Sequence, residues 1–357
     1  MGKGVETFSP FYERLATSFP GYIIGKLVLS AALGVVFLAA HYAAIGHRVF
    51  EDWSWFLAPL ITTAMLALYY ATHTLRGMLP EMSLRLRLPG DRDVHDGADE
   101  DSDGIFMQPL NATLSDSKFI AAGLFFGFIN CAMGFAFGVP YETTCALATI
   151  LFGFFLAGFV CGMAAWGIYG VAATVAAFAR AAKRSLDYTA PDQCGGVRFL
   201  GEGLVVFSSV TLIVGVMISV YIHQFHWTRE ALPAVVALQW AWIVFPYALS
   251  LVVLVGPAVP INDALRQYKV EKEAEQLQTL DAISRQLAAA PLDSAKRKEL
   301  RDERAYQQDA RKELHAMGTW PHGMSAKVKY LGILVANLLA SATTASSLLT
   351  KLLKPTI

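Results

Sequence analysis

Hydrophobic side chains along this chain gather into long runs separated by polar segments, and this pattern predicts membrane-spanning helices. None of Asp, Glu, Lys or Arg occurs within 119–141, 143–179, 203–228 or 231–262. Each run is long enough to cross a hydrocarbon core of about 30 Å as a helix that rises about 1.5 Å per residue. The pattern therefore predicts an all-α, polytopic membrane protein.

The runs resolve into six spanning helices bounded by polar residues. We expect them near residues 22–45, 54–75, 119–139, 144–178, 203–225 and 233–256. They form a transmembrane domain over 22–256, which follows an N-terminal segment, 1–21, and contains a polar insert at 76–117. Alternating or extended residues at 84–88 and 105–114 predict a small β-hairpin within that insert.

A polar region after the last span, 257–325, predicts a helical hairpin. Residues 261–290 and 294–317 are typical of two helices separated by Pro291. A narrow apolar stripe runs along the first of them, at Leu277, Leu280, Ile283 and Leu287. Such a stripe indicates either a hairpin folded against its own subunit or a coiled-coil stalk that assembles with neighbours.

The last segment, 326–357, is apolar at helical spacing, but its second half carries Ser and Thr. We expect an amphipathic helix docked at the inner membrane surface or beneath the bundle. A seventh span, or a helix that lines a central cavity with its Ser and Thr face, is the alternative.

The positions of Lys and Arg orient the chain in the membrane. Eleven of them lie before the first span or in the loops after the second and fourth spans, whereas the opposite loops hold only Arg48 and Arg229. An excess of Lys and Arg marks the cytoplasmic side. We therefore expect both termini, the insert and the hairpin to lie in the cytoplasm, with the bundle in a plasma or inner membrane.

Composition supports this class and excludes others. A hydrophobic fraction of 55% with only 16% charged residues is typical of a polytopic helical membrane protein. A formal net charge of zero gives no support for nucleic-acid binding, which needs a basic surface. Besides the lipid bilayer, we expect a homo-oligomer and a cytoplasmic protein as partners.

Small residues at four-residue spacing mark the third and fourth spans. The pairs are Gly123 with Gly127, Gly134 with Gly138, and Gly158 with Gly162. This spacing lets helix backbones approach closely, and such packing drives helix association within lipid. It predicts either a tight hairpin within one subunit or a seam that lines a pore or joins subunits.

The fourth apolar run continues past its span, from Val171 to Ala182. Its end is expected to project toward the cytoplasm and to need a protein partner there, for which another subunit is one candidate.

A hinge is one interpretation of the sixth span and its end. Pro246 interrupts the helical hydrogen bonding, and Gly256 and Pro257 separate the span from the polar hairpin. A static kink is the simpler interpretation. Ionisable residues are almost absent from the middle of the spans, which disfavours a proton-driven pump.

An acidic stretch in the insert resembles the opening of a calcium-binding loop. Asp99, Asp101 and Asp103 alternate and precede Gly104, so their carboxylates are able to converge on one hard cation. Leu110 stands where the second half of that pattern requires Glu. Calcium is therefore the one cofactor we consider, and a solvated acidic loop is the alternative.

The predicted topology brings histidines to one depth, at the outer ends of the first and fifth spans. Neutral imidazoles of His41, His223 and His226 are suitable ligands for a transition metal or for haem. Ordinary interfacial histidines are the alternative, because no Cys or carboxylate completes the set.

A glycine-rich loop at 191–196 lacks the Lys and the Ser or Thr of a phosphate-binding motif. It predicts a tight turn that packs on the cytoplasmic domain. Since the loops contain no evident catalytic arrangement, we expect no enzymatic activity.

The leading hypothesis from sequence is a homo-oligomeric membrane channel or regulated pore with a cytoplasmic assembly or gating domain. A non-conducting membrane scaffold or sensor that signals to a cytoplasmic partner is the first alternative. A haem or metal redox membrane subunit is the second.

Overall fold

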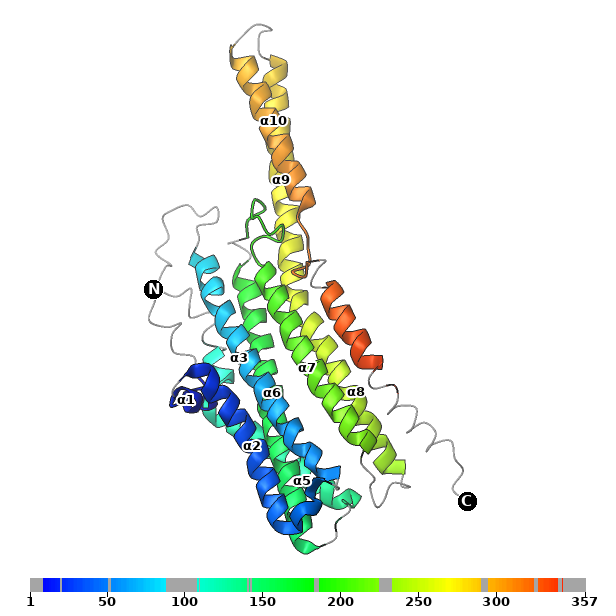
Figure 1. Cartoon of the computed structure of the whole chain (residues 1–357). Helices are drawn as coiled ribbons and strands as arrows, with labels where there is room; N and C mark the ends of the chain where they lie inside the picture. The colour runs from blue at the N-terminus through cyan, green and yellow to red at the C-terminus, as the bar shows by residue number, and fades with distance from the viewer. Residues whose placement is uncertain are drawn as a thin grey trace.

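The protein is an all-α membrane bundle with a long helical hairpin at one end (Figure 1). The computed structural model describes residues 9–19, 21–50, 53–87, 108, 110–139, 141, 143–182, 186–224, 233–289, 295–323, 327–339 and 342. Within these residues, six helical segments are long and apolar enough to cross a membrane, which confirms the expected fold class.

The spanning helices alternate in direction, and α9 continues from α8 out of the bundle. They are α1 (Phe11–Thr17), α2 (Tyr22–Ile45), α3 (Leu57–Arg87), α5 (Asp116–Phe137), α6 (Thr144–Ala182), α7 (Arg198–Gln224), α8 (Pro233–Val255), α9 (Ala258–Ala289) and α10 (Ala295–Ala316). Short 3₁₀ turns η2 (Gly46–Phe50) and η3 (Trp53–Phe56) join α2 to α3.

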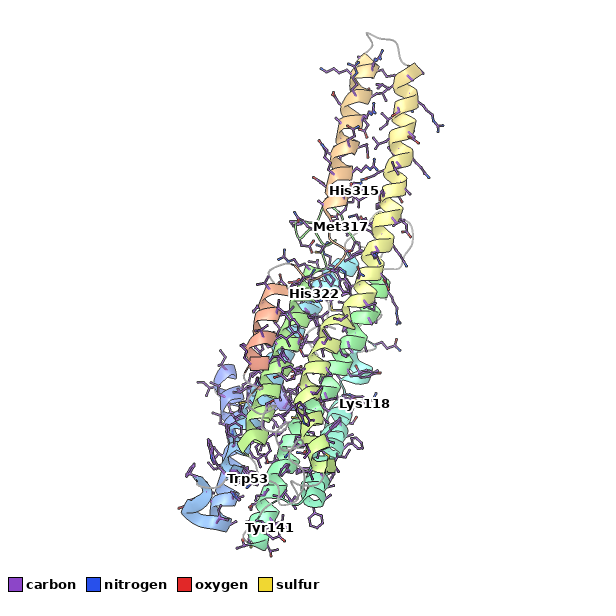
Figure 2. All side chains as sticks on the ribbon, turned by 90° about the vertical axis from the view of Figure 1, so that its right-hand side faces the viewer. Trp53, Lys118, Tyr141, His315, Met317 and His322 are labelled. Carbon is purple, nitrogen blue, oxygen red and sulfur yellow. The ribbon has the colours of Figure 1, made fainter. Side chains whose placement is uncertain are left out.

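The α9–α10 hairpin, here called the stalk, projects from one end of the bundle, which we call the stalk end (Figure 1). Trp53 and Tyr141 lie at the opposite end, the far end (Figure 2).

Several helices extend further toward the stalk than the apolar runs indicate. The second span was expected to stop near residue 75, but α3 continues as a helix to Arg87 with Pro80 inside it. The β-hairpin expected from 84–88 and 105–114 is wrong where those residues are described, because 84–87 and 110–113 are helical. Side-chain alternation in this short stretch is overridden by the continuing α3.

Glycines bring α5 and α6 into close main-chain contact. A Cβ on Gly158 would lie 2.6 Å from the Phe126 carbonyl oxygen, and one on Gly162 would lie 2.5 Å from that of Ala122. Gly123 and Gly127 face Phe159 and Phe155 of α6 in the same way. These four glycines therefore form a seam within one chain.

The other predicted glycine pair has a different role. Gly138 adopts a left-handed conformation, with φ of 78°, and ends α5 there. A Cβ on Gly134 would lie 3.3 Å from a Val139 methyl and 3.4 Å from one of Leu151, so this glycine meets side chains rather than the backbone of another helix.

The extension of α6 beyond the bundle packs against its own chain. Val175, Phe178 and Ala179 are buried in one cluster with Ile261 and Leu265 of α9. The base of the stalk is therefore the partner that this apolar extension needs. A second subunit is not required to cover it.

A helix over 327–339 packs lengthwise along α7 and α8. The Tyr330 hydroxyl lies 3.1 Å from the Ser250 hydroxyl, and the Tyr247 hydroxyl donates to the Asn337 carbonyl oxygen at 2.9 Å. Its apolar outer face, with Leu331 and Leu339, is exposed. Residues 343–357 lie outside the described residues, so a surface helix and a seventh span both stay predictions.

Candidate functional site

A groove of about 440 Å³ runs along the membrane bundle between the α5–α6 pair and the α7–α8 pair, with α3 as its floor. Its volume falls within the range of about 300–1,000 Å³ typical of small-molecule sites. From Leu60 to Leu75, α3 lines it over about 22 Å at about 1.5 Å per residue. The groove is therefore long, narrow and almost wholly apolar.

The groove opens at its side, and aromatic and aliphatic residues pack near both of its ends. At the far end, Phe154 and Tyr221 pack ring to ring, with centroids 6.2 Å apart. At the stalk end, Leu75 and Phe207 belong to the main core cluster. Along the side, α5 packs mainly on α6 and α8 mainly on α7, so the opening lies between α5 and α8.

Aromatic side chains form the two edges of this opening. Phe126 of α5 and Phe245 of α8 line the groove and remain 40% and 59% exposed. Because these helices span the membrane, the opening faces the hydrocarbon chains of the bilayer rather than water.

Few polar side chains line the groove, and they gather toward its ends. Asn130 of α5 donates through Nδ2 to the Phe154 carbonyl oxygen at 2.7 Å. At the stalk end, the hydroxyls of Tyr12 and Thr72 lie 2.8 Å apart. Thr72 in turn donates to the Leu68 carbonyl oxygen. Both hydroxyls thus have hydrogen-bond partners in the residues that line the groove.

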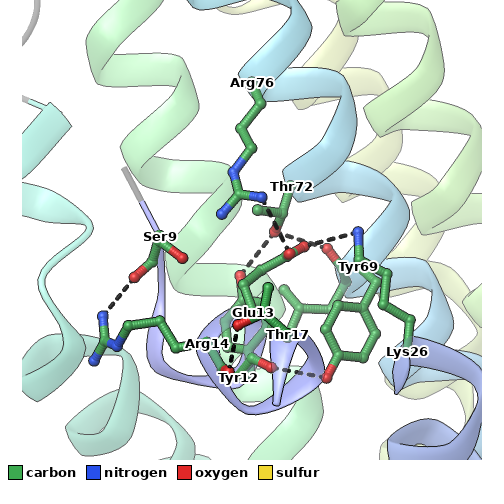
Figure 3. Close-up of polar contacts among 10 residues, drawn as sticks. Ser9, Tyr12, Glu13, Arg14, Thr17, Lys26, Tyr69, Thr72 and Arg76 are labelled. Carbon is green, nitrogen blue, oxygen red and sulfur yellow. Dashed lines mark hydrogen bonds and ion pairs between the residues drawn. The ribbon is translucent and has the colours of Figure 1, made fainter. Parts of the chain in front are cut away.

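Beyond Tyr12, the short helix α1 places a buried carboxylate beside two cations (Figure 3). Glu13 is fully buried, and its oxygens lie 3.0 Å from Lys26 Nζ and 3.2 Å from Arg76 Nη1. Lys26 also lies over the Tyr69 ring, 5.5 Å from its centroid. The cluster joins α1 to α2 and α3, because a buried charge is stable only when paired.

Further charges hold the other side of α1. Asp116, at the start of α5, accepts the main-chain N–H of Phe11 at 2.9 Å and pairs with Arg14. Lys118, one half-turn further along α5, donates to the Ala112 carbonyl oxygen. Sequence reasoning missed this cluster, since Glu13 is seen as a membrane-buried charge only once α1 is docked.

The α1 helix approaches α2 at a glycine. A Cβ on Gly25 would overlap the Ala16 carbonyl oxygen, so only glycine fits at this position. This close contact brings the carboxylate of Glu13 within reach of Lys26, the next residue of α2.

The stalk is held at its base by the C-terminal end of α10 and the segment that follows it. Lys269 of α9 donates to the carbonyl oxygens of His315 and Met317 at 2.9 and 3.1 Å. Figure 2 shows His315, Met317 and His322 in succession from the stalk down to the bundle. The return segment 317–323 therefore ties α10 to α9 before it reaches α7 and α8.

The glycine-rich loop before α7 packs on the stalk base, as its sequence indicates. Asp192 accepts the main-chain N–H groups of Cys194, Gly196 and Arg198 at 2.9–3.1 Å. Its carboxylate thus occupies the amide nest in which a phosphate would bind. Gly318 N–H donates to the loop at the Gln193 carbonyl, 2.8 Å away.

His322 joins the return segment to the membrane helices. Its Nδ1 lies 3.2 Å from the Gly201 carbonyl oxygen of α7, and its Nε2 lies 3.2 Å from the Leu254 carbonyl oxygen of α8. Burial lowers the pKa of His322, although both carbonyls favour its protonated form. The stalk base is therefore fastened to both helices of the α7–α8 pair.

The proposed hinge residues lie on the path from the groove to the stalk. Pro246 lines the groove and packs on Gly215, where an added Cβ would lie 2.7 Å from the Pro246 Cβ. Helix α8 continues through Pro246, and only Gly256 and Pro257 separate α8 from α9. Hinge motion at these residues stays a prediction.

The predicted metal sites are only partly described. His41 is buried, with Nδ1 2.7 Å from the Thr149 hydroxyl and Nε2 2.6 Å from the Ser54 hydroxyl. Thr149 has its own carbonyl acceptors, so it accepts from His41 Nδ1–H, and Ser54 donates to Nε2. Both ring nitrogens of His41 therefore have a hydroxyl within hydrogen-bonding distance.

The remaining predicted ligands lie outside what the structure describes. These are the side chain of His223, His226 and the acidic loop with Asp99, Asp101 and Asp103. Among the described residues, no group of three or more His, Cys, Asp or Glu side chains is arranged to hold a metal ion. Both the calcium and the haem or transition-metal hypotheses stay predictions.

Models of protein families, curated proteins and solved structures were compared with this chain, and none matches it. The functional argument therefore rests on the geometry of the groove, the α1 cluster and the stalk base.

Proposed function

We propose that this protein is a non-catalytic, non-conducting membrane scaffold that carries its stalk to a protein partner and transmits the state of its membrane helices to that partner. The observation that carries this proposal is the path of α8. This helix lines the groove within the membrane and leads through Gly256 and Pro257 directly into α9 of the stalk.

The contacts at the base of the stalk support the idea that the stalk moves with α8 rather than being loosely tethered to it. Contacts from α6, from the loop before α7 and from His322 all converge on the base of the hairpin. A displacement of α8 at the groove is then expected to move the stalk as a unit. From the charge distribution along the sequence, we place the stalk and both termini in the cytoplasm.

Two observations favour a scaffold over the channel that the sequence first suggested. The glycines that offered a seam between subunits are used inside one chain, at the α5–α6 contact. The groove within the protomer is apolar, whereas an ion path needs polar or carbonyl-lined walls. A pore would have to form between protomers, and that remains a separate prediction.

The stalk presents an apolar surface that suits a protein partner. Val270 and Leu277 lie two turns apart on α9 and are 67% and 42% exposed. Residues at this spacing share one helix face, as in helical recognition of a groove or of another helix.

Photo-cross-linking of the full-length protein in its native membrane tests the proposal. We expect one partner to be captured by the wild type and reduced at least tenfold by the double variant Val270→Glu and Leu277→Glu. Gln278→Glu is the matched control, since Gln278 is exposed beside Leu277 on a different face of α9. Capture that is equal in all three proteins contradicts the proposed partner surface.

Ion flux through proteoliposomes decides between the scaffold and the channel. We expect no flux above that of empty liposomes, at any calcium concentration, pH or voltage. Flux that scales with the amount of protein would overturn the non-conducting assignment.

A further inference from the structure

We propose that the groove holds one hydrocarbon chain of an anionic phospholipid, whose phosphate lies at the α1 charge cluster. This inference concerns the membrane domain and stands apart from the partner of the stalk. Three features carry it: the lateral opening, the length of the apolar wall, and the sign of the charge at one end.

The opening faces the lipid of the bilayer. It lies between α5 and α8, within the spanning part of both helices, and Phe126 and Phe245 form its edges. Acyl chains are the apolar molecules that surround these helices. The wall of about 22 Å along α3 exceeds the length of one leaflet, about 15 Å, so an extended chain fits within it.

The polar end of the groove leads directly to charges. Tyr12, Thr72 and Phe119 line this end of the groove. Glu13 follows Tyr12 in the sequence, and Lys118 precedes Phe119. The residues next to Tyr12 and Phe119 thus carry charges of the cluster, in the order that a lipid presents its chain and its headgroup.

The sign of the charge selects an anionic headgroup. Among the described residues, the cations Arg14, Lys26 and Arg76 pair with the carboxylates Glu13 and Asp116, and a fourth cation, Lys118, lies two residues after Asp116. Cations therefore exceed carboxylates by two at this depth. Basic residues at a membrane surface attract anionic lipids, and the attraction falls when one is neutralised.

Native mass spectrometry of detergent-purified protein tests the inference by titration with phosphatidylglycerol and, separately, with phosphatidylcholine of the same chains. We expect wild-type protein to retain phosphatidylglycerol at higher collision energy than phosphatidylcholine. Lys118→Gln should reduce the preference about fivefold, which corresponds to one basic residue. Equal retention of the two lipids by wild type would overturn the headgroup assignment.

Groove-filling variants test the chain position. Ala67→Phe and Ala165→Leu place bulk in the groove from α3 and α6, whereas Ala121→Phe places it on the exposed face of α5. We expect both groove variants to lose bound phosphatidylglycerol and the control to keep it. If either folded groove variant retains as much lipid as Ala121→Phe, the lipid binds elsewhere or only adventitiously, and the inference is wrong.

Folding of each variant is checked by its elution volume and thermal midpoint before lipid is added. If Ala67→Phe does not fold, the milder Ala165→Leu carries the test of the chain position, and Lys118→Gln tests the headgroup without changing the groove.

Discussion

The α5–α6 seam and the groove beside it are built from similar apolar helices, yet one closes to main-chain contact and the other stays open. At the seam, Gly158 and Gly162 of α6 have no side chain and lie against main-chain carbonyls of α5. Across the groove, Phe126, Trp242 and Phe245 stand along α5 and α8. Since lipid exerts no hydrophobic force between helices, small residues decide which surfaces close.

The comparison also shows where this protein is rigid and where it has room to change. The seam, the α1 cluster and the stalk base are fixed by close packing, ion pairs and hydrogen bonds. The groove separates the α5–α6 pair from α8, which leads to the stalk. The predictions below test this contrast, from the largest expected effect to the smallest.

Closing the seam with a side chain should do the most damage. Gly162→Leu is expected to destabilise the protein by about 3 kcal/mol, because its Cβ already meets the Ala122 carbonyl oxygen at 2.5 Å. Gly77→Leu is the matched control, since nothing lies within 4 Å of an added Cβ there. Thermal midpoints in lipid nanodiscs measure both, and equal losses would contradict a seam at Gly162.

Removing the buried charge of α1 should have the next largest effect. Glu13→Gln leaves Lys26 and Arg76 without their carboxylate, and we expect a loss of about 2 kcal/mol because both cations are partly exposed. Arg14→Gln, at an exposed ion pair, should cost less than about 1 kcal/mol. Chemical denaturation of the two variants gives the comparison, and a larger loss in Arg14→Gln would contradict the role given to the buried Glu13 pairs.

A hydrogen bond within the α7–α8 pair should contribute less. Ser250 bonds to Ser208 and to Tyr330, so Ser250→Ala is expected to cost about 0.6–1 kcal/mol. Ser209→Ala removes only a bond to the Val205 carbonyl of its own helix and serves as the control. Indistinguishable thermal midpoints would show that the hydroxyl network does not hold the pair together.

The smallest effect concerns pH at the stalk base. Burial holds the pKa of His322 below its ordinary value, so the unfolded state binds the proton more readily than the folded state. Stability from this residue is present above the ordinary pKa and is lost as pH falls through it. We expect His322→Gln to lose less stability than wild type between pH 7.5 and 5.5; parallel losses would contradict this.

The spans were predictable because charge-free runs of sufficient length have few alternatives, and the range expected for the first span, 22–45, coincides with α2. The bounds of α3 were not, since Arg76, Glu81 and Arg85 mark a membrane edge without ending a helix. Amphipathic helices pass beyond the bilayer freely, and hydropathy alone does not detect this.

The candidate site was largely beyond sequence reasoning. Glu13 lies on a helix of seven residues, and its partners Lys26 and Arg76 come from two other helices. The groove lies where helix surfaces fail to pack on one another. No periodic pattern of residues in the sequence marks such a gap. The glycines of the third and fourth spans were recognised, but only the structure shows that they pair within one chain.

The most direct test of the central claim, that α8 couples the groove to the stalk, is hydrogen exchange of the wild-type protein in nanodiscs. Phosphatidylglycerol and phosphatidylcholine discs are compared, with peptides from 256–268 and 317–323 as the readout. The account predicts that amide protection at the stalk base changes together with that of the groove-lining part of α8. A change in α8 that leaves the stalk base unaltered would contradict it.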